Sequence, residues 1–248
     1  MTPAPWWEVA FGADYPALYA HRDDQAAGAE VAGIVPRLRE AVMATGLPVL
    51  DVGCGGGRHL QALRAAGLPA FGFDLSPHLL AQARARPTVT GGLTRADMRL
   101  PPLADGSCAA VVLLFTAFGY FDDESNAACF AALARLVAPG GWLLLDLPDP
   151  DHVRQTLVPR SERTLADGRM AVEERRLVGN RVEKTVTIGE AAPYVESVRL
   201  YAPDELHTLA QSNLRPLENI WPSLCGSEII GNRHIAWFRA DIHFPIGG

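Results

Sequence analysis

The stretch 51-DVGCGGG-57 decides how this chain folds. It follows a short apolar run, 47-LPVLDV-52, and opens a segment with helical periodicity, 58-RHLQALRAA-66. Short apolar runs that end at glycines are typical of buried strands. Glycines let the backbone turn tightly and approach a ligand, and the N-terminus of the helix adds free N–H groups. We therefore predict a ligand-binding turn between a strand and a helix, with Asp51 at the strand tip, where it can take a cationic amine or a water-bridged partner.

A second acidic residue lies at a matching position. Asp74 falls near the end of the next apolar run, 70-AFGFDL-75, twenty-one residues after Gly53. In a strand–helix–strand unit this spacing brings the carboxylate beside the glycine turn, where it can accept hydrogen bonds from both hydroxyl groups of a ribose. The two features together predict a nucleoside-bearing cofactor, without identifying it.

The spacing of the glycines separates two classes of cofactor. The dinucleotide fingerprint GxGxxG would require a third glycine at position 58, where this chain has Arg58. The third glycine of that fingerprint allows the helix to pack closely on the strand. Because an arginine would crowd this packing, the observed pattern DxGxGxG favours a methyl-donor cofactor over NAD.

Apolar runs and amphipathic segments alternate on both sides of the glycine turn. Further strands are expected at about 92–96, 108–115, 142–147, 214–221 and 234–241, and further helices at 24–45, 76–86, 123–137 and 203–212. This alternation predicts parallel βαβ units with right-handed connections. We expect an α/β fold with a doubly wound, seven-stranded, mostly parallel sheet whose last strand is antiparallel. The ligand should lie outside the C-terminal ends of the first two strands.

Between residues 169 and 200 the apolar periodicity changes to every second residue, and 178-VGNR-181 has the composition of a hairpin turn. We expect a small antiparallel β insert, which would serve as a lid or as a dimer contact. The expected division of the chain is an N-terminal helical segment that covers the cofactor (1–45), a core (46–150 and 201–248) and the insert (151–200).

Five short motifs, taken in order, resemble the class I (Rossmann-like) S-adenosylmethionine-dependent methyltransferases. They are 51-DVGCGGGRH-59, 72-GFDLS-76, 96-ADMRLPP-102, 115-FTAFGYF-121 and 138-APGGWLLLDL-147. The resemblance covers about residues 47–148 and is specific because five weak motifs agree in spacing. The segment 11-FGADYPALYAHRDD-24 and the β insert are similar, less specifically, to small-molecule members with a lid.

The resemblance implies that the chain binds S-adenosylmethionine, which methyl transfer converts to S-adenosylhomocysteine. In such enzymes the glycine turn packs on the methionine part of the cofactor, Asp74 holds the ribose, and Asp97 bonds the adenine amino group. Tyr15, Tyr19 and Arg22 would close over the methionine end. The full set assigned to the cofactor is Asp51, Gly53, Cys54, Gly55, Gly57, Asp74, Leu75, Asp97, Met98, Phe115, Tyr15, Tyr19 and Arg22.

Aromatic residues after the fourth strand and on the insert are candidates for the acceptor pocket. They would shape an apolar pocket or stack on the sulfonium ion, with core packing as the alternative. The candidates are Phe118, Tyr120, Tyr194 and Tyr201. No catalytic dyad is evident, and the motif [DN]-P-P-[FY] of many base and amide methyltransferases does not follow the fourth strand. Tyr120 and His207 are the candidates for proton transfer, although a histidine on an amphipathic helix is more often structural.

Composition limits the partners. The chain has 248 residues, 48% of them apolar, and a formal net charge of -6, which argues against coating nucleic acid. The four cysteines form no CxxC pair, so we expect no metal site and a reducing, cytoplasmic setting. No apolar stretch reaches the length of a membrane span, and the N-terminus does not read as a signal peptide. We expect a small-molecule substrate, no nucleic acid or membrane partner, and compatibility with a homodimer.

Three other functions stay open. An NAD-dependent oxidoreductase is disfavoured by Arg58. A non-catalytic cofactor-binding protein is disfavoured by the intact Asp51, Asp74 and glycines. A methyltransferase that acts on protein or RNA is disfavoured by the acidic charge balance and the small insert.

Overall fold

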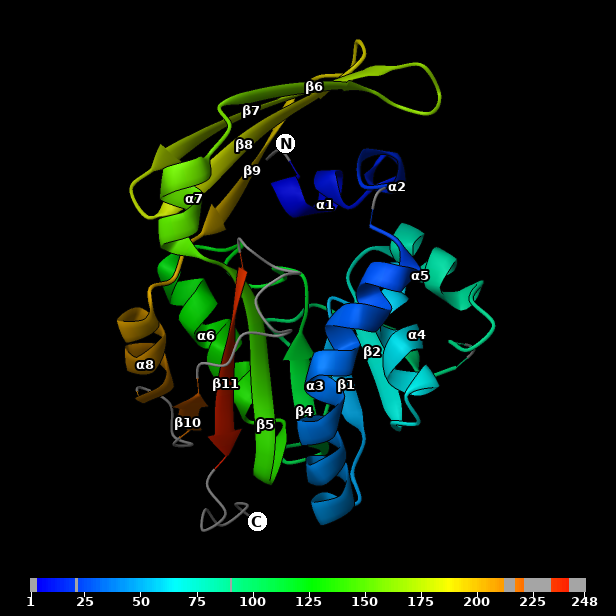
Figure 1. Ribbon diagram of the computed structural model, residues 1–248, viewed down its shortest axis with the longest axis vertical. Coiled ribbons are helices and arrows are strands. Elements are labelled where there is room, and N and C mark those ends of the chain that lie inside the picture. Colours follow the sequence, from blue (N-terminus) through cyan, green and yellow to red (C-terminus); the bar gives the residue numbers. More distant parts are fainter. Residues whose placement is uncertain (1–3, 21, 90, 212–216, 221–232, 241–248) are drawn as a thin grey trace.

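The main sheet fixes the architecture of the protein (Figure 1). The computed structural model describes residues 4–20, 22–89, 91–211, 217–220 and 233–240. Within these residues, seven strands form one sheet in the order β10-β11-β5-β4-β1-β2-β3. Their bounds are β1 Val49–Val52, β2 Ala70–Asp74, β3 Leu93–Arg95, β4 Cys108–Leu113, β5 Val137–Pro148, β10 Leu217–Ile220 and β11 Arg233–Ala240.

The pairing of the strands confirms the expected fold. β1 pairs in parallel with β2 on one side and with β4 on the other, while β11 pairs antiparallel with β5. The strand order therefore reverses between β1 and β4. In a doubly wound sheet such a reversal opens a crevice at the C-terminal ends of the strands. The glycine turn directly follows β1 and so lies at this crevice.

Helices cover both faces of the sheet (Figure 1). They are α3 Asp24–Thr45, α4 Arg58–Ala65, α5 Pro77–Arg84, α6 Asp123–Ala134 and α8 Pro203–Gln211. Successive β1 residues Val49 and Leu50 belong to opposite apolar cores, one formed with α3, α4 and α5, the other with α6 and α8. Side chains define several helix starts. Ser76 accepts a hydrogen bond from the Leu79 N–H at 3.2 Å, as expected for an N-cap.

Two boundaries differ from the expected ones. α6 ends at Ala134, and β5 already begins at Val137, although the sequence pattern favoured a helix to 137 and a strand from 142. Cys108 of β4 pairs with Val137, with a register irregularity before Ala110 pairs with Trp142. Pairing with a buried neighbour thus overrides the helical periodicity of this segment.

A second, antiparallel sheet stands over the C-terminal ends of the main sheet (Figure 1). It has the order β6-β7-β8-β9, with bounds Arg160–Thr164, Met170–Val178, Arg181–Ile188 and Tyr194–Arg199. Val178 pairs with Arg181, so the expected hairpin turn is present. Strand β6 and helix α7 (Pro150–Thr156) were not expected, because their short, polar sequences carry no apolar periodicity.

The N-terminal segment lies between the two sheets (Figure 1). It forms two short helices, α1 (Trp6–Ala10) and α2 (Tyr15–Leu18), before α3 begins. Leu18 is buried in an apolar cluster with residues of β7 and β8, so α2 packs on the second sheet. None of the helices within the described ranges is both long and apolar enough to cross a bilayer.

Candidate active site

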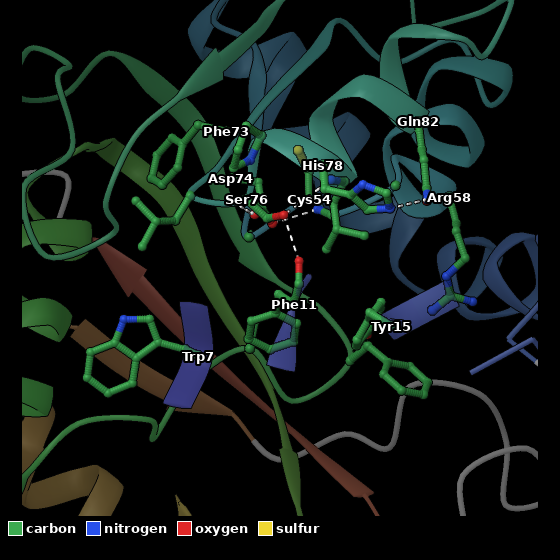
Figure 2. Close-up of a pocket in the computed structure, with 18 of the residues that line it drawn as sticks. Trp7, Phe11, Tyr15, Cys54, Arg58, Phe73, Asp74, Ser76, His78 and Gln82 are labelled. Carbon is green, nitrogen blue, oxygen red and sulfur yellow. Dashed lines mark hydrogen bonds between the residues drawn. The ribbon is translucent and has the colours of Figure 1, made fainter. Parts of the chain in front are cut away.

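A cavity of about 490 Å³ opens at the crevice of the main sheet (Figure 2). Its walls come from the glycine turn, the ends of β2 and β4, the N-terminus of α5 and the N-terminal segment. Trp7, Phe11 and Tyr15 lie on one side, opposite Asp74 and Ser76 (Figure 2). The volume is in the range of small-molecule and cofactor pockets.

Asp74 holds the glycine turn against the end of β2. One carboxylate oxygen accepts a hydrogen bond from the Gly55 N–H at 2.8 Å, and the other accepts one from the Ser76 N–H at 2.7 Å. Burial raises the pKa of Asp74, and these backbone donors oppose the rise. Gly53, Cys54 and Gly55 line the cavity with it, whereas Gly57 packs behind the turn against α5. The predicted proximity of Asp74 and the glycine turn is therefore present.

Asp51 lies behind the cavity wall rather than at an open strand tip. Its side chain is 2% exposed, and one carboxylate oxygen has no hydrogen-bond partner among the described residues. Burial, followed by the nearby charge of Asp74, raises the pKa of Asp51 to about 8. Asp51 is still paired within the sheet, opposite Gly72 and Val112, and this location explains why it cannot reach the cavity directly.

The acidic residue after β3, Asp97, also lines the cavity. Asp97 is held by Arg99, whose Nη2 donates to a carboxylate oxygen at 2.6 Å and whose backbone N–H donates to the other at 2.9 Å. The side-chain hydrogen bond from Arg99 lowers the pKa of Asp97, so this carboxylate is ionised. Leu75 and Met98 line the cavity as well. Asp97, which the resemblance assigns to the adenine amino group, is thus in the same cavity as two further residues of the predicted cofactor set.

The residues assigned to the methionine end also meet in the cavity. The Arg22 guanidinium donates to the Tyr15 hydroxyl at 2.9 Å and lies 3.7 Å from the centroid of the Tyr19 ring and 4.1 Å from that of Phe115. Nε of Arg22 is buried without a partner among the described residues. Arg58 approaches the same Phe115 ring, at 5.1 Å. Two guanidinium groups therefore face this end, which suits an anionic ligand group.

A buried ionic network behind Phe115 was not predicted from the sequence. Asp146 of β5 pairs with Arg233 of β11 at 2.6 Å, Arg233 pairs with Glu30 of α3, and Glu30 lies 2.6 Å from His59 Nε2. Burial raises the pKa of Asp146 to about 7. Burial opposes ionisation of Glu30 as well, but His59 and Arg233 outweigh it and lower the pKa to about 2. A carboxylate within the apolar run 142-WLLLDLP-148 was the available signal.

Aromatic side chains form the wall contributed by α1 and the segment after β4. Trp7 packs edge-on against Phe121 with 5.0 Å between ring centroids, and Phe11 lies 5.7 Å from Tyr120. The Ser76 hydroxyl donates to the Phe11 carbonyl at 2.7 Å, which fastens α1 to α5 across the cavity (Figure 2). Trp7 and Phe11 were missed, because the sequence 6-WWEVAF-11 lacks a clear period.

Several candidates for acceptor binding or proton transfer lie elsewhere. Phe118, after β4, and Tyr201, after β9, pack against each other in the core with 5.5 Å between ring centroids, and Phe118 also contacts Phe130 of α6. Tyr194 packs with Tyr19 and Leu18 on the second sheet and does not line the cavity. His207 is exposed on α8, on the far side of the core (Figure 1). Of this group, Tyr120 alone lines the cavity, where burial raises its pKa.

Comparisons with known proteins agree with this geometry. Residues 49–141 match the family described as "Methyltransferase domain". The chain is 37% identical over 103 residues to a ubiquinone biosynthesis O-methyltransferase of Thiobacillus denitrificans, covering 40% of this chain and 43% of the relative. It is 32% identical over 146 residues to a dTDP-3-amino-3,4,6-trideoxy-α-D-glucopyranose N,N-dimethyltransferase of Streptomyces venezuelae, covering 56% and 60%.

One solved structure is similar along nearly the whole chain. It is an amino pentose methyltransferase from Micromonospora echinaspora, solved with S-adenosylmethionine bound, with 25% identity, a TM-score of 0.68 and coverage of 91% of this chain and 95% of that chain. The alignments with the curated relatives, in contrast, span less than two thirds of each relative's length. The chain contains a methyltransferase domain, and the resemblance to the class I S-adenosylmethionine-dependent methyltransferases is confirmed.

Proposed function

We propose that this chain transfers a methyl group from S-adenosylmethionine to a small-molecule acceptor. The observation that carries the proposal is the position of Asp74, which is hydrogen-bonded to the glycine turn and faces a cavity at the switch point of the sheet. Asp74 would accept the ribose hydroxyls, and Asp97 would lie at the adenine end. Arg22 would receive the carboxylate of the methionine part, to which its unpartnered Nε is suited.

The reaction needs little beyond placement. The acceptor's lone pair forms a bond to the methyl carbon while the carbon–sulfur bond breaks, and its electron pair stays on sulfur. Holding the two reactants in line removes most of the entropic barrier. The aromatic rings of Phe11, Tyr15 and Tyr120 can stabilise positive charge, first on sulfur and then on a methylated nitrogen. A base is needed only if the acceptor atom must lose a proton before it attacks.

An amine on a sugar-like molecule is the acceptor class to test first. In sequence, the O-methyltransferase of Thiobacillus denitrificans aligns with 40% of the chain and the amino sugar N,N-dimethyltransferase with 56%. In structure, the amino pentose methyltransferase matches 91% of the chain, which includes most of the second sheet that stands over the cavity (Figure 1). A neutral amine also attacks without a dedicated base, and the wall formed by α1 and the segment after β4 offers aromatic rings to the cation that results.

The test is a methyl-transfer assay with isotopically labelled S-adenosylmethionine. Acceptors would be a nucleoside-diphosphate amino sugar, its hydroxyl analogue and a catechol precursor of a quinone. We expect label on the amino sugar, abolition by Asp74→Ala and no effect of Asp151→Ala, a control on an exposed α7 carboxylate. If the catechol alone were labelled, the acceptor class would be a catechol rather than an amino sugar. Turnover of none of them, together with failure to bind the cofactor, would overturn the proposal.

A further inference from the structure

The backbone that carries Phe115 into the cavity wall is in an unusual conformation. Phe115 and Thr116 have φ values of +57° and +60°, and both are non-glycine residues in the left-handed region. Such a conformation persists only where the surroundings hold it. The two residues begin one residue after β4, at the switch point of the sheet, and Phe115 lines the cavity.

A single residue, Asp146, holds both backbone positions. Its carboxylate accepts a hydrogen bond from the Phe115 N–H at 2.6 Å, and its carbonyl accepts one from the Thr116 N–H at 3.0 Å. The same carboxylate oxygen pairs with Nη1 of Arg233 at 2.6 Å. The side chain of Asp146 is 1% exposed and that of Arg233 is 8% exposed, so water competes little for these contacts.

The network reaches helices α3 and α4, of which α4 borders the cavity. Arg233 also pairs with Glu30 of α3, and Glu30 contacts His59, which lies in the first turn of α4 and lines the cavity. Buried ion pairs are often no more stabilising than apolar packing of the same volume. A network of this size therefore contributes most by fixing geometry, here between α3, α4, β5, β11 and the strained turn.

We infer that Asp146 and Arg233 are positioning residues that set the place of Phe115 and, through its ring, of the two cavity-facing arginines. The guanidinium groups of Arg22, Arg58 and Arg233 lie 4.1, 5.1 and 4.4 Å from the centroid of the Phe115 ring. This inference rests on the proposed function, because it assigns those arginines to the methionine end of S-adenosylmethionine. Neither Asp146 nor Arg233 lines the cavity itself.

The test is a double-mutant cycle on binding of S-adenosylhomocysteine, measured by calorimetry. Arg233→Met should weaken binding about 10-fold, the order of coupling seen between contacting residues. Once Phe115 is replaced by Leu, Arg233→Met should have little further effect, because it acts through that ring. Arg239→Met, at an exposed position near the other end of the same strand, is the control and should leave binding within about 2-fold.

Arg233→Lys keeps the positive charge between Asp146 and Glu30. It is the second variant to measure if Arg233→Met folds poorly, and it should recover most of the affinity for S-adenosylhomocysteine. The inference would be overturned if Arg233→Met weakened binding by the same factor with Phe115 present and with Phe115→Leu. It would also be overturned if Arg233→Met bound S-adenosylhomocysteine like the control. Failure of the unmutated protein to bind S-adenosylhomocysteine is a separate result, because it rejects the proposed function rather than the role of the network.

Discussion

The two sheets of this molecule place charge in opposite ways. The main sheet buries almost continuous apolar strands, as β4 does with Cys108–Leu113, and confines its buried carboxylates, Asp51 and Asp146, to the strands around the switch point. The second sheet buries charge in the middle of its inner face, where Lys184 pairs with Glu196 at 2.7 Å and lies 3.5 Å from Glu173. The main sheet thus keeps its buried carboxylates to the strands near the cavity, and the second sheet buries a charged cluster on the face that meets the N-terminal segment.

The difference indicates how each sheet contributes to the cavity. The main sheet offers fixed backbone groups, such as the Gly55 N–H, to the ligand and to Asp74. The second sheet acts through the N-terminal segment. Lys184 donates a hydrogen bond to the Tyr19 hydroxyl, and Arg169 pairs with Asp14 at 2.6 Å. The cover of the cavity is thus held by polar contacts and by the apolar cluster around Leu18, whereas its floor belongs to the core.

Breaking the buried charge of the second sheet should have the largest effect on stability. Burial opposes the charged form of Lys184, but Glu196 outweighs it and the pKa of Lys184 is raised, so the lysine is charged. Lys184→Met leaves Glu196 without its partner, and loss of a buried partner costs about 3–5 kcal/mol. Urea unfolding measures the change. Arg176→Met, which breaks an exposed pair on the outer face, should cost less than about 1 kcal/mol. Equal losses would contradict the contrast between the faces.

Two glycines with the same backbone conformation test the packing of the glycine turn. Gly57 (φ +78°) and Gly67 (φ +79°) both strain any other residue, but a Cβ at Gly57 would lie 3.0 Å from Ala83 Cβ, while nothing lies within 4 Å at Gly67. Each change to alanine should cost about 1 kcal/mol for the left-handed backbone. Gly57→Ala should cost about 1–3 kcal/mol more through overpacking. Thermal unfolding of the Gly57→Ala and Gly67→Ala variants measures the difference. Equal unfolding midpoints would show that α5 shifts to accept the added Cβ without a cost in stability.

The smallest expected effect, taken per pH unit, is a slope of stability with pH. In the folded protein Asp51 keeps its proton up to about pH 8, whereas in the unfolded chain it loses the proton near pH 4. The contribution of Asp51 to the free energy of unfolding should therefore be greatest below about pH 4. It should fall as pH rises from about 4 to 8, by at most about 1.4 kcal/mol per pH unit. Asp51→Asn should flatten this slope in urea unfolding of the ligand-free protein. The pKa of Asp146, raised to about 7, leaves a residual slope of the same sign. An unchanged slope would mean that Asp51 is ionised in the fold.

The features that the sequence predicts are those with local chemistry. The glycine turn, Asp74 and the hairpin at Gly179–Asn180 each depend on residues near one another in the chain, and the parallel βαβ units follow from the alternation of strand and helix patterns. The cofactor residues Asp97 and Arg22 came from the resemblance, and both line the cavity. A short motif, with its spacing, is enough for this part of the site.

The remaining features depend on contacts between distant segments. The partners in the network behind Phe115 are separated by 29, 87 and 203 residues, so no window of sequence contains them. Phe118 and Tyr120 are two residues apart with similar chemistry, yet Phe118 is buried in the core and Tyr120 lines the cavity. Which of them faces the ligand depends on how the turn after β4 is held.

The most direct test of the central claim is calorimetric titration of S-adenosylhomocysteine and NADH into the protein and its Asp74→Ala variant. We predict that S-adenosylhomocysteine binds and NADH does not. Asp74→Ala should weaken binding by about 100-fold or more, because hydrogen bonds to a charged group contribute about 1.5–3 kcal/mol each. Asp151→Ala should bind like the unmutated protein. Binding of NADH, or binding of S-adenosylhomocysteine that is unchanged in Asp74→Ala, would contradict the assignment of this cavity to the methyl donor.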